Sequence, residues 1–122
     1  MNAKRKALVV DDTELHRNLI KLSLVSRNYA VTVAMDGREG LEACRETTFD
    51  LVFSDFEMPN MNGAEFLRAV KRLPGYNRVP VVILSTLTDP ALIQRVMNFG
   101  AFHYIVKPFT TSKLDELFAK LA

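Results

Sequence analysis

The chain has 122 residues, of which 48% are hydrophobic and 25% are charged, so its length and composition fit one globular domain spanning residues 1–122. The formal net charge of +2 argues against direct binding of nucleic acid, because domains that bind nucleic acid usually carry a strongly basic face. The chain contains one cysteine, Cys44, which excludes an internal disulfide and is typical of a protein of the reducing cytoplasm.

The sequence predicts neither a signal peptide nor a membrane-spanning segment. The first apolar run, residues 7–10, is followed directly by two aspartates, unlike the apolar region of a signal peptide. The longest uncharged stretch, residues 79–88, contains Pro80 and is far shorter than the roughly 20 apolar residues that a membrane-spanning helix requires. We therefore expect a soluble, cytoplasmic protein with no membrane partner.

Short apolar runs alternate with segments of helical periodicity along the chain. The runs are rich in β-branched residues and predict buried strands over residues 7–10, 31–34, 51–53, 81–84 and 102–106. Apolar spacing and capping signals predict helices over residues 13–28, from 36–37 onward, around 66–70, from 89–90 to 100 and over 114–121. The first helix is predicted from the spacing of Leu15, Leu19, Leu22 and Val25.

Two of the helix starts have a specific capping signal. Asp36 and Asp89 are predicted to cap the second and fourth helices, and Pro90 fits the first helical position after Asp89. Each connection between consecutive strands is long enough to contain a helix, which favours parallel pairing with right-handed crossovers. The sequence therefore predicts an α/β fold with an open, doubly wound parallel sheet.

Polar side chains follow four of the five predicted strands. In chain order they are Asp11 and Asp12, then Asp55, then Ser85 and Thr86, and finally Lys107. In open α/β sheets ligands bind outside the carboxyl ends of the strands, so these side chains are expected at one rim. Each alone has an ordinary explanation as a helix cap, a turn residue or a loop lysine.

Convergence of three carboxylates is what favours a functional site over capping. Like charges held close together repel one another, and a hard divalent cation would neutralise them; ligands that are all oxygen favour Mg²⁺ over zinc. A carboxylate beside that ion can attack a phosphoryl donor and form an aspartyl phosphate. The ammonium of Lys107 and the hydroxyl of Ser85 are suited to contact the phosphoryl oxygens.

Five segments carry a resemblance to a known family. They are residues 8–12 (LVVDD), 55–59 (DFEMP) followed by Gly63, 83–86 (ILST), 100–101 (GA) and 104–109 (YIVKPF). With these segments in this order, the sequence resembles the receiver domain of bacterial two-component response regulators. The resemblance implies a flavodoxin-like (βα)5 fold with a five-stranded parallel sheet in the order 2-1-3-4-5.

The resemblance also implies a phosphoryl-transfer reaction. Asp55 is then the phosphoacceptor, and the donor is a sensor histidine kinase or a histidine phosphotransfer protein. Asp12, Asp55 and the main-chain carbonyl of Glu57 are the implied Mg²⁺ ligands, with Asp11 acting partly through water. Such a chain is a signalling receiver that catalyses only its own phosphorylation and dephosphorylation.

A conformational switch is implied in the same way. Lys107 would pair with Asp55 or its phosphate, and the peptide bond between Lys107 and Pro108 is expected to be cis. Ser85 and Tyr104 correspond to the switch pair, in which the hydroxyl moves to the phosphate and the ring turns inward. Thr86 stands where a small residue is common and would narrow access to the phosphoryl group.

The implied output surface comprises the fourth predicted helix, the fifth strand and the last helix, and it would control a downstream protein. Both a monomer and a phosphorylation-induced homodimer are compatible with the sequence. If the chain is complete, it resembles a single-domain receiver of chemotaxis or of a phosphorelay; if it is a piece, a DNA-binding or enzymatic domain could follow it.

Two functions of other classes remain as alternatives. One is an interaction scaffold that works without phosphorylation, which the full set of polar rim residues disfavours. The other is a Mg²⁺-dependent phosphohydrolase, which usually needs an additional substrate-binding segment for which 122 residues leave little room. His16 and His103 show no metal-ligand spacing and are interpreted as solvated or hydrogen-bonded side chains.

Overall fold

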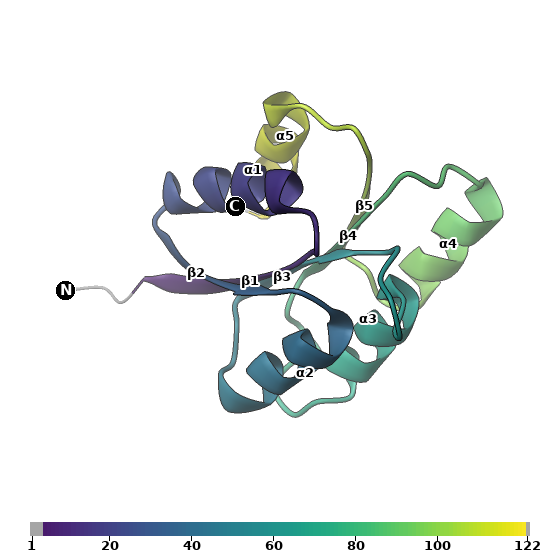
Figure 1. Cartoon of the computed structure of the whole chain (residues 1–122), viewed down its shortest axis with the longest axis horizontal. Helices are drawn as coiled ribbons and strands as arrows, with labels where there is room; N and C mark the ends of the chain where they lie inside the picture. Colours follow the sequence, from purple (N-terminus) through teal and green to yellow (C-terminus); the bar gives the residue numbers. More distant parts are fainter. Residues whose placement is uncertain (1–3, 122) are drawn as a thin grey trace.

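The computed structural model describes residues 4–121, in which strands and helices alternate (Figure 1). The strands are β1 (Arg5–Val10), β2 (Tyr29–Ala34), β3 (Leu51–Asp55), β4 (Val81–Ser85) and β5 (His103–Val106). The helices are α1 (Glu14–Val25), α2 (Gly37–Glu46), α3 (Gly63–Lys71), α4 (Pro90–Asn98) and α5 (Thr111–Leu121). The domain predicted over residues 1–122 includes residues 1–3 and 122, which lie outside the described residues.

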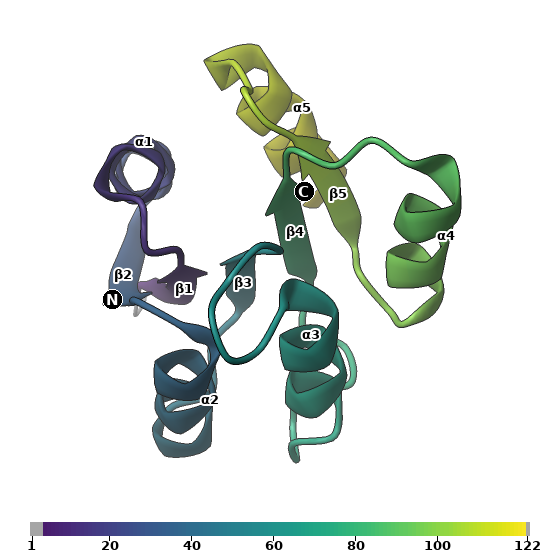
Figure 2. The ribbon, with the colours of Figure 1, turned by 45° about the vertical axis from the view of Figure 1, so that its right-hand side comes forward.

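The strands form one parallel sheet in the order β2-β1-β3-β4-β5, as predicted. Helices α1 and α5 cover one face of the sheet, and α2, α3 and α4 cover the other (Figures 1 and 2). This arrangement confirms the doubly wound α/β fold. Among residues 4–121, the structure contains no helix both long enough and apolar enough to cross a membrane.

The sheet separates two hydrophobic cores, and alternate residues of each strand enter opposite cores. In β1, Leu8 and Val10 pack toward α2 and α3, whereas Ala7 and Val9 pack toward α1 and α5. Because helices cover both faces, the central strands must be apolar on both faces. This requirement explains why their sequences are uniform apolar runs rather than alternating ones.

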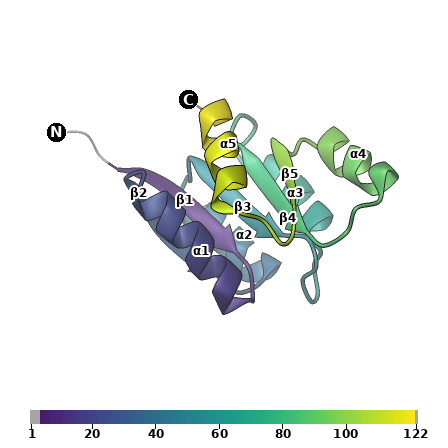
Figure 3. The same cartoon turned by 90° about the horizontal axis from the view of Figure 1, so that it is seen from above.

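The apolar residues that predict α1 lie on its outer face. Leu15, Leu19, Leu22 and Val25 are 66%, 40%, 70% and 52% exposed, whereas the inner face of the helix buries Ile20 and Leu24. Figure 3 views the molecule from the side that α1 and α5 cover. The helix therefore exists where the periodicity places it, but it is apolar on two faces, and spacing alone does not tell which of them meets the sheet.

Local chemistry sets the ends of the helices. The side chains of Asp36 and Asp89 accept hydrogen bonds from Glu39 N and Ala91 N, which confirms both predicted caps. The prediction of a first helix over residues 13–28 was too long at its carboxyl end. The chain leaves the helix after Val25 and turns through Asn28, whose φ of 66° lies in the left-handed region.

Tyr76 joins the α2–β3 connection to the loop after α3. Its hydroxyl donates to the carbonyl of Thr47 at 2.6 Å and accepts a hydrogen bond from Phe49 N at 3.0 Å. The side chain is 1% exposed, and burial raises the pKa of Tyr76 well above its usual value. The hydroxyl therefore stays neutral and holds the segment that leads into β3.

We expect Tyr76→Phe to lower the free energy of unfolding by about 1–3 kcal/mol, because it leaves a buried N–H and a carbonyl without their partner. Urea unfolding measures this loss. Tyr29→Phe is the matched control, since Tyr29 is also buried but its hydroxyl has no hydrogen-bond partner within residues 4–121. Equal losses in the two variants would contradict a special role for the Tyr76 hydroxyl.

Candidate functional site

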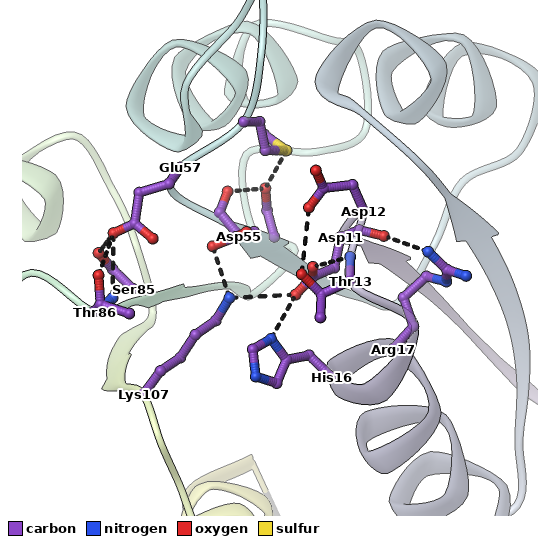
Figure 4. A network of polar contacts seen from close by, with 12 residues as sticks. Asp11, Asp12, Thr13, His16, Arg17, Asp55, Glu57, Ser85, Thr86 and Lys107 are labelled. Carbon is purple, nitrogen blue, oxygen red and sulfur yellow. Dashed lines mark hydrogen bonds and ion pairs between the residues drawn. The ribbon is translucent and has the colours of Figure 1, made fainter.

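The parallel sheet brings the predicted polar residues to one rim. The pairs Val10–Ser54, Asp55–Leu84 and Ser85–Val106 lie side by side in neighbouring strands, so the residues at the strand ends share one edge. Figure 4 shows the resulting network of Asp11, Asp12, Asp55, Glu57, Ser85, Thr86 and Lys107. Tyr104 lies outside this network and contacts the β4–α4 loop instead.

The three aspartates form the acidic part of the rim. Asp11 and Asp55 are buried, Asp12 is exposed, and one carboxylate oxygen from each lies within 4.8 Å of the others. Burial raises the pKa of Asp55; the hydrogen bond and charge of Lys107 oppose this effect, and the charges of Asp11 and Glu57 add to it. The chemistry of this donor set, three convergent carboxylates, fits a hard divalent cation.

Lys107 is the buried cation of the rim. Its Nζ atom donates to Asp55 Oδ1 at 3.0 Å and lies 3.5 Å from Asp11 Oδ2. Its main-chain N–H donates to the carbonyl of Ser85 at 2.8 Å, which fixes the end of β5 against the end of β4. The peptide bond between Lys107 and Pro108 is cis. One ammonium faces three carboxylates, so the pocket keeps an excess of negative charge.

The side chain of Glu57 makes contacts that the sequence did not predict. Its Oε1 atom accepts hydrogen bonds from Ser85 Oγ at 2.7 Å, Thr86 Oγ1 at 3.0 Å and Thr86 N at 3.2 Å. Partial burial opposes ionisation, but these hydrogen bonds outweigh it and lower the pKa of Glu57. The resemblance assigned the main-chain carbonyl of Glu57 to the metal and implied no hydrogen bond from its side chain to Ser85 or Thr86.

Ser85 and Tyr104 are linked through Leu87. The Leu87 N–H donates to Ser85 Oγ at 3.0 Å, and the Tyr104 hydroxyl donates to the Leu87 carbonyl at 2.8 Å. The two residues assigned to the switch are therefore not in direct contact in this conformation. A short segment of the β4–α4 loop connects them.

His16 lies closer to the rim than the sequence suggests. Its Nδ1 atom is 3.8 Å from Asp11 Oδ2, and its ring lies 6.3 Å from that of Phe109, centroid to centroid. Within residues 4–121 this buried nitrogen has no hydrogen-bond partner, which differs from the interpretation of His16 as a solvated or hydrogen-bonded side chain. No sequence signal marks this placement, because it depends on how α1 packs beside β1.

Fold and rim together define a receiver domain, and comparison with known proteins agrees. The model of the response regulator receiver domain family matches residues 7–119, and the chain belongs to this family of signalling modules. A probable chemotaxis protein CheY of Rhizobium etli is 38% identical over 112 residues, which cover 91% of this chain and 87% of that protein.

Other relatives show the same similarity in a longer protein and in one of about the same length. Response regulator ArlR of Staphylococcus saprophyticus is 34% identical over 116 residues, which cover 95% of this chain and 50% of that protein. The solved structure of chemotaxis response regulator CheY4 of Vibrio cholerae has a TM-score of 0.90 and 34% identity, covering 98% of this chain and 100% of that one. The similarity thus extends to receivers that are about as long as this chain.

Removing one charge from the rim should stabilise the protein when no cation is bound. We expect Asp12→Asn to raise Tm by about 4 °C, which corresponds to about 1 kcal/mol for a domain of this size, because it relieves repulsion from Asp11 and Asp55. Millimolar Mg²⁺ should raise the Tm of the wild type and have a much smaller effect on the variant.

Scanning calorimetry with Mg²⁺ and with a chelator measures both effects. Glu46→Gln removes one exposed carboxylate from the last turn of α2, away from the rim, and is the matched control for net charge. An Asp12→Asn variant that is less stable without cation and gains the wild-type increase with Mg²⁺ would contradict this account of the rim.

Proposed function

We propose that this chain is a phosphoacceptor receiver that takes a phosphoryl group from a phosphohistidine onto Asp55 in a Mg²⁺-dependent reaction. The observation that carries the proposal is the contact of Lys107 Nζ with Asp55 Oδ1 at 3.0 Å, inside a pocket that Asp11 and Asp12 make acidic. A structural ion pair would need one carboxylate, and two further carboxylates beside it oppose folding unless they bind something.

Asp55 is the nucleophile in this proposal. One of its carboxylate oxygens attacks the phosphorus, the bond from phosphorus to the imidazole nitrogen of the donor breaks, and the imidazole leaves with that electron pair. Lys107 positions the carboxylate before the reaction and offers a charge to a phosphoryl oxygen during it. The donor is a sensor histidine kinase or a histidine phosphotransfer protein.

Asp11, Asp12, Asp55 and the main-chain carbonyl of Glu57 are the groups that would hold Mg²⁺. When bound, the ion supplies positive charge that lowers the repulsion between an acidic pocket and an anionic phosphoryl group. A local contact restrains the Asp11 carboxylate, since its Oδ1 accepts a hydrogen bond from Thr13 N at 2.8 Å. Arg17 donates to the Asp11 main-chain carbonyl at 3.0 Å.

Output is proposed to pass through the surface formed by α4, β5 and α5. Ser85 and Thr86 follow Leu84, the residue of β4 paired with Asp55, and would contact a phosphoryl group on Asp55; Tyr104 belongs to β5 on this surface. A change at the β4–α4 loop would therefore alter the surface offered to a downstream protein.

The chemistry is tested by incubating the protein with phosphoramidate and Mg²⁺ and recording the intact mass. We expect a gain of one phosphoryl group that a chelator prevents. Asp55→Asn, which keeps the size of the side chain and removes the nucleophile, should gain none. A folded protein that binds Mg²⁺ and never gains the group would favour the scaffold alternative, and release of free phosphate without an adduct would favour the hydrolase.

The output surface is tested with beryllofluoride, which mimics a phosphoryl group on a carboxylate. With Mg²⁺ present, we expect amide resonances of residues 85–87 and of α4, β5 and α5 to shift in ¹H–¹⁵N spectra. Amides of the last turn of α2, at the end of that helix away from the contact of Gly37 with Met61, should stay in place, and Asp55→Asn should abolish the shifts. Shifts confined to the metal-binding residues would contradict the proposed output surface.

A further inference from the structure

We propose that the side chain of Glu57 is an internal latch, whose carboxylate occupies the hydrogen-bond donors of Ser85 and Thr86 that a phosphoryl group on Asp55 would engage. The inference rests on the proposed function, since it concerns the regulation of the same site. It makes Glu57 a positioning residue that favours the unphosphorylated conformation. The name latch refers below to the three hydrogen bonds that Glu57 Oε1 accepts.

One carboxylate oxygen saturates the donors at the end of β4. Ser85 has a single hydroxyl proton, and it points to Glu57 Oε1 over 2.7 Å. Thr86 contributes both its hydroxyl and its main-chain N–H to the same oxygen. None of these three donors can serve a phosphoryl oxygen while the latch is closed.

A carboxylate oxygen and a phosphoryl oxygen can accept hydrogen bonds from the same donors. Both are anionic acceptors that form short, charge-assisted hydrogen bonds. The three donors therefore form an anion-binding set that the chain fills with its own side chain. A phosphoryl group must displace Glu57 before Ser85 can turn toward it, so the two anions compete.

The side chain and the main chain of Glu57 belong to separate parts of the rim. In Figure 4 the carboxylate of Glu57 points toward Ser85 and Thr86, on the side away from Asp12. The main-chain carbonyl is the group assigned to the metal. A substitution of the side chain therefore changes the latch and leaves the carbonyl in the chain.

The latch also connects to Tyr104. Ser85 Oγ donates to Glu57 and accepts from the Leu87 N–H at 3.0 Å, and the Leu87 carbonyl accepts from the Tyr104 hydroxyl. Glu57 and Tyr104 are thus linked indirectly, through hydrogen bonds to the two main-chain groups of Leu87. When Ser85 leaves Glu57, Leu87 loses its anchor, and so does the hydroxyl of Tyr104.

The decisive variant is Glu57→Asp, which keeps the negative charge but is one methylene too short to reach Ser85. We measure the dissociation constant of beryllofluoride at fixed Mg²⁺ by ¹⁹F NMR, for the wild type, Glu57→Asp, Glu57→Gln and Glu57→Ala. Glu57→Asp and Glu57→Ala should bind roughly tenfold tighter than the wild type. Glu57→Gln, a neutral acceptor of the same length, should fall between them and the wild type.

A second readout needs no bound ligand. The Thr86 amide proton donates to a carboxylate in the wild type, so its resonance should move upfield in Glu57→Asp and Glu57→Ala. Resonances of the Tyr104 ring should change in the same two variants. Because Glu57 is exposed, we expect all three variants to fold, and their thermal unfolding verifies it.

The outcomes separate the latch from the proposed function. Unchanged or weaker binding in both Glu57→Asp and Glu57→Ala overturns the latch while leaving the phosphoacceptor role intact. Tighter binding in Glu57→Ala alone also overturns it, since the effect is then one of charge and not of contact. If neither wild type nor any variant binds beryllofluoride, the phosphoacceptor role fails, and the latch fails with it because there is no anion to compete.

Discussion

The crowding of three carboxylates around one buried ammonium is the constraint on which the rest of the rim depends. Lys107 reaches both Asp55 and Asp11, and it does so from a side chain that is itself buried. Such an arrangement is costly, because each buried charge loses its hydration and only one positive charge is present. It persists because a rigid sheet holds the four groups in place, and its excess of negative charge fits a divalent cation.

The two cores supply that rigidity. Asp11 directly follows strand β1. The last four residues of β1 are fully buried between the helices of both faces. Gly63, at the start of α3, shows how closely the loop between β3 and α3 is packed. A Cβ atom at Gly63 would lie 2.7 Å from Phe56 Cα and 2.9 Å from the carbonyl of Asp55, so only glycine lets the loop pass this close to the end of β3. Packing of uncharged groups around the rim thus helps determine how near the charges come.

Strand ends were predictable from the sequence, and loop contacts were not. Asp11, Asp55, Ser85 and Lys107 could be assigned to one rim because parallel strands end at the same edge of a sheet, whatever their details. The Glu57 contacts depend on how two loops, 28 residues apart along the chain, approach one another. No periodicity or capping signal encodes that approach. The inner face of α1 escaped prediction for a different reason, because both faces of that helix are apolar and only the sheet selects between them.

If the latch acts as proposed, competition between two anions sets how this receiver responds. If Glu57 held Ser85 too firmly, the conformation able to accept a phosphoryl group would be rare, and the apparent affinity for that group would fall in proportion. If nothing held Ser85, the β4–α4 loop would sample the active arrangement without a signal. A glutamate that is partly exposed to water lies between these limits, since water weakens its hydrogen bonds relative to those of a buried carboxylate. On the proposed latch, residue 57 is therefore a position at which the balance between rest and response can be adjusted without altering Lys107 or the three aspartates of the rim.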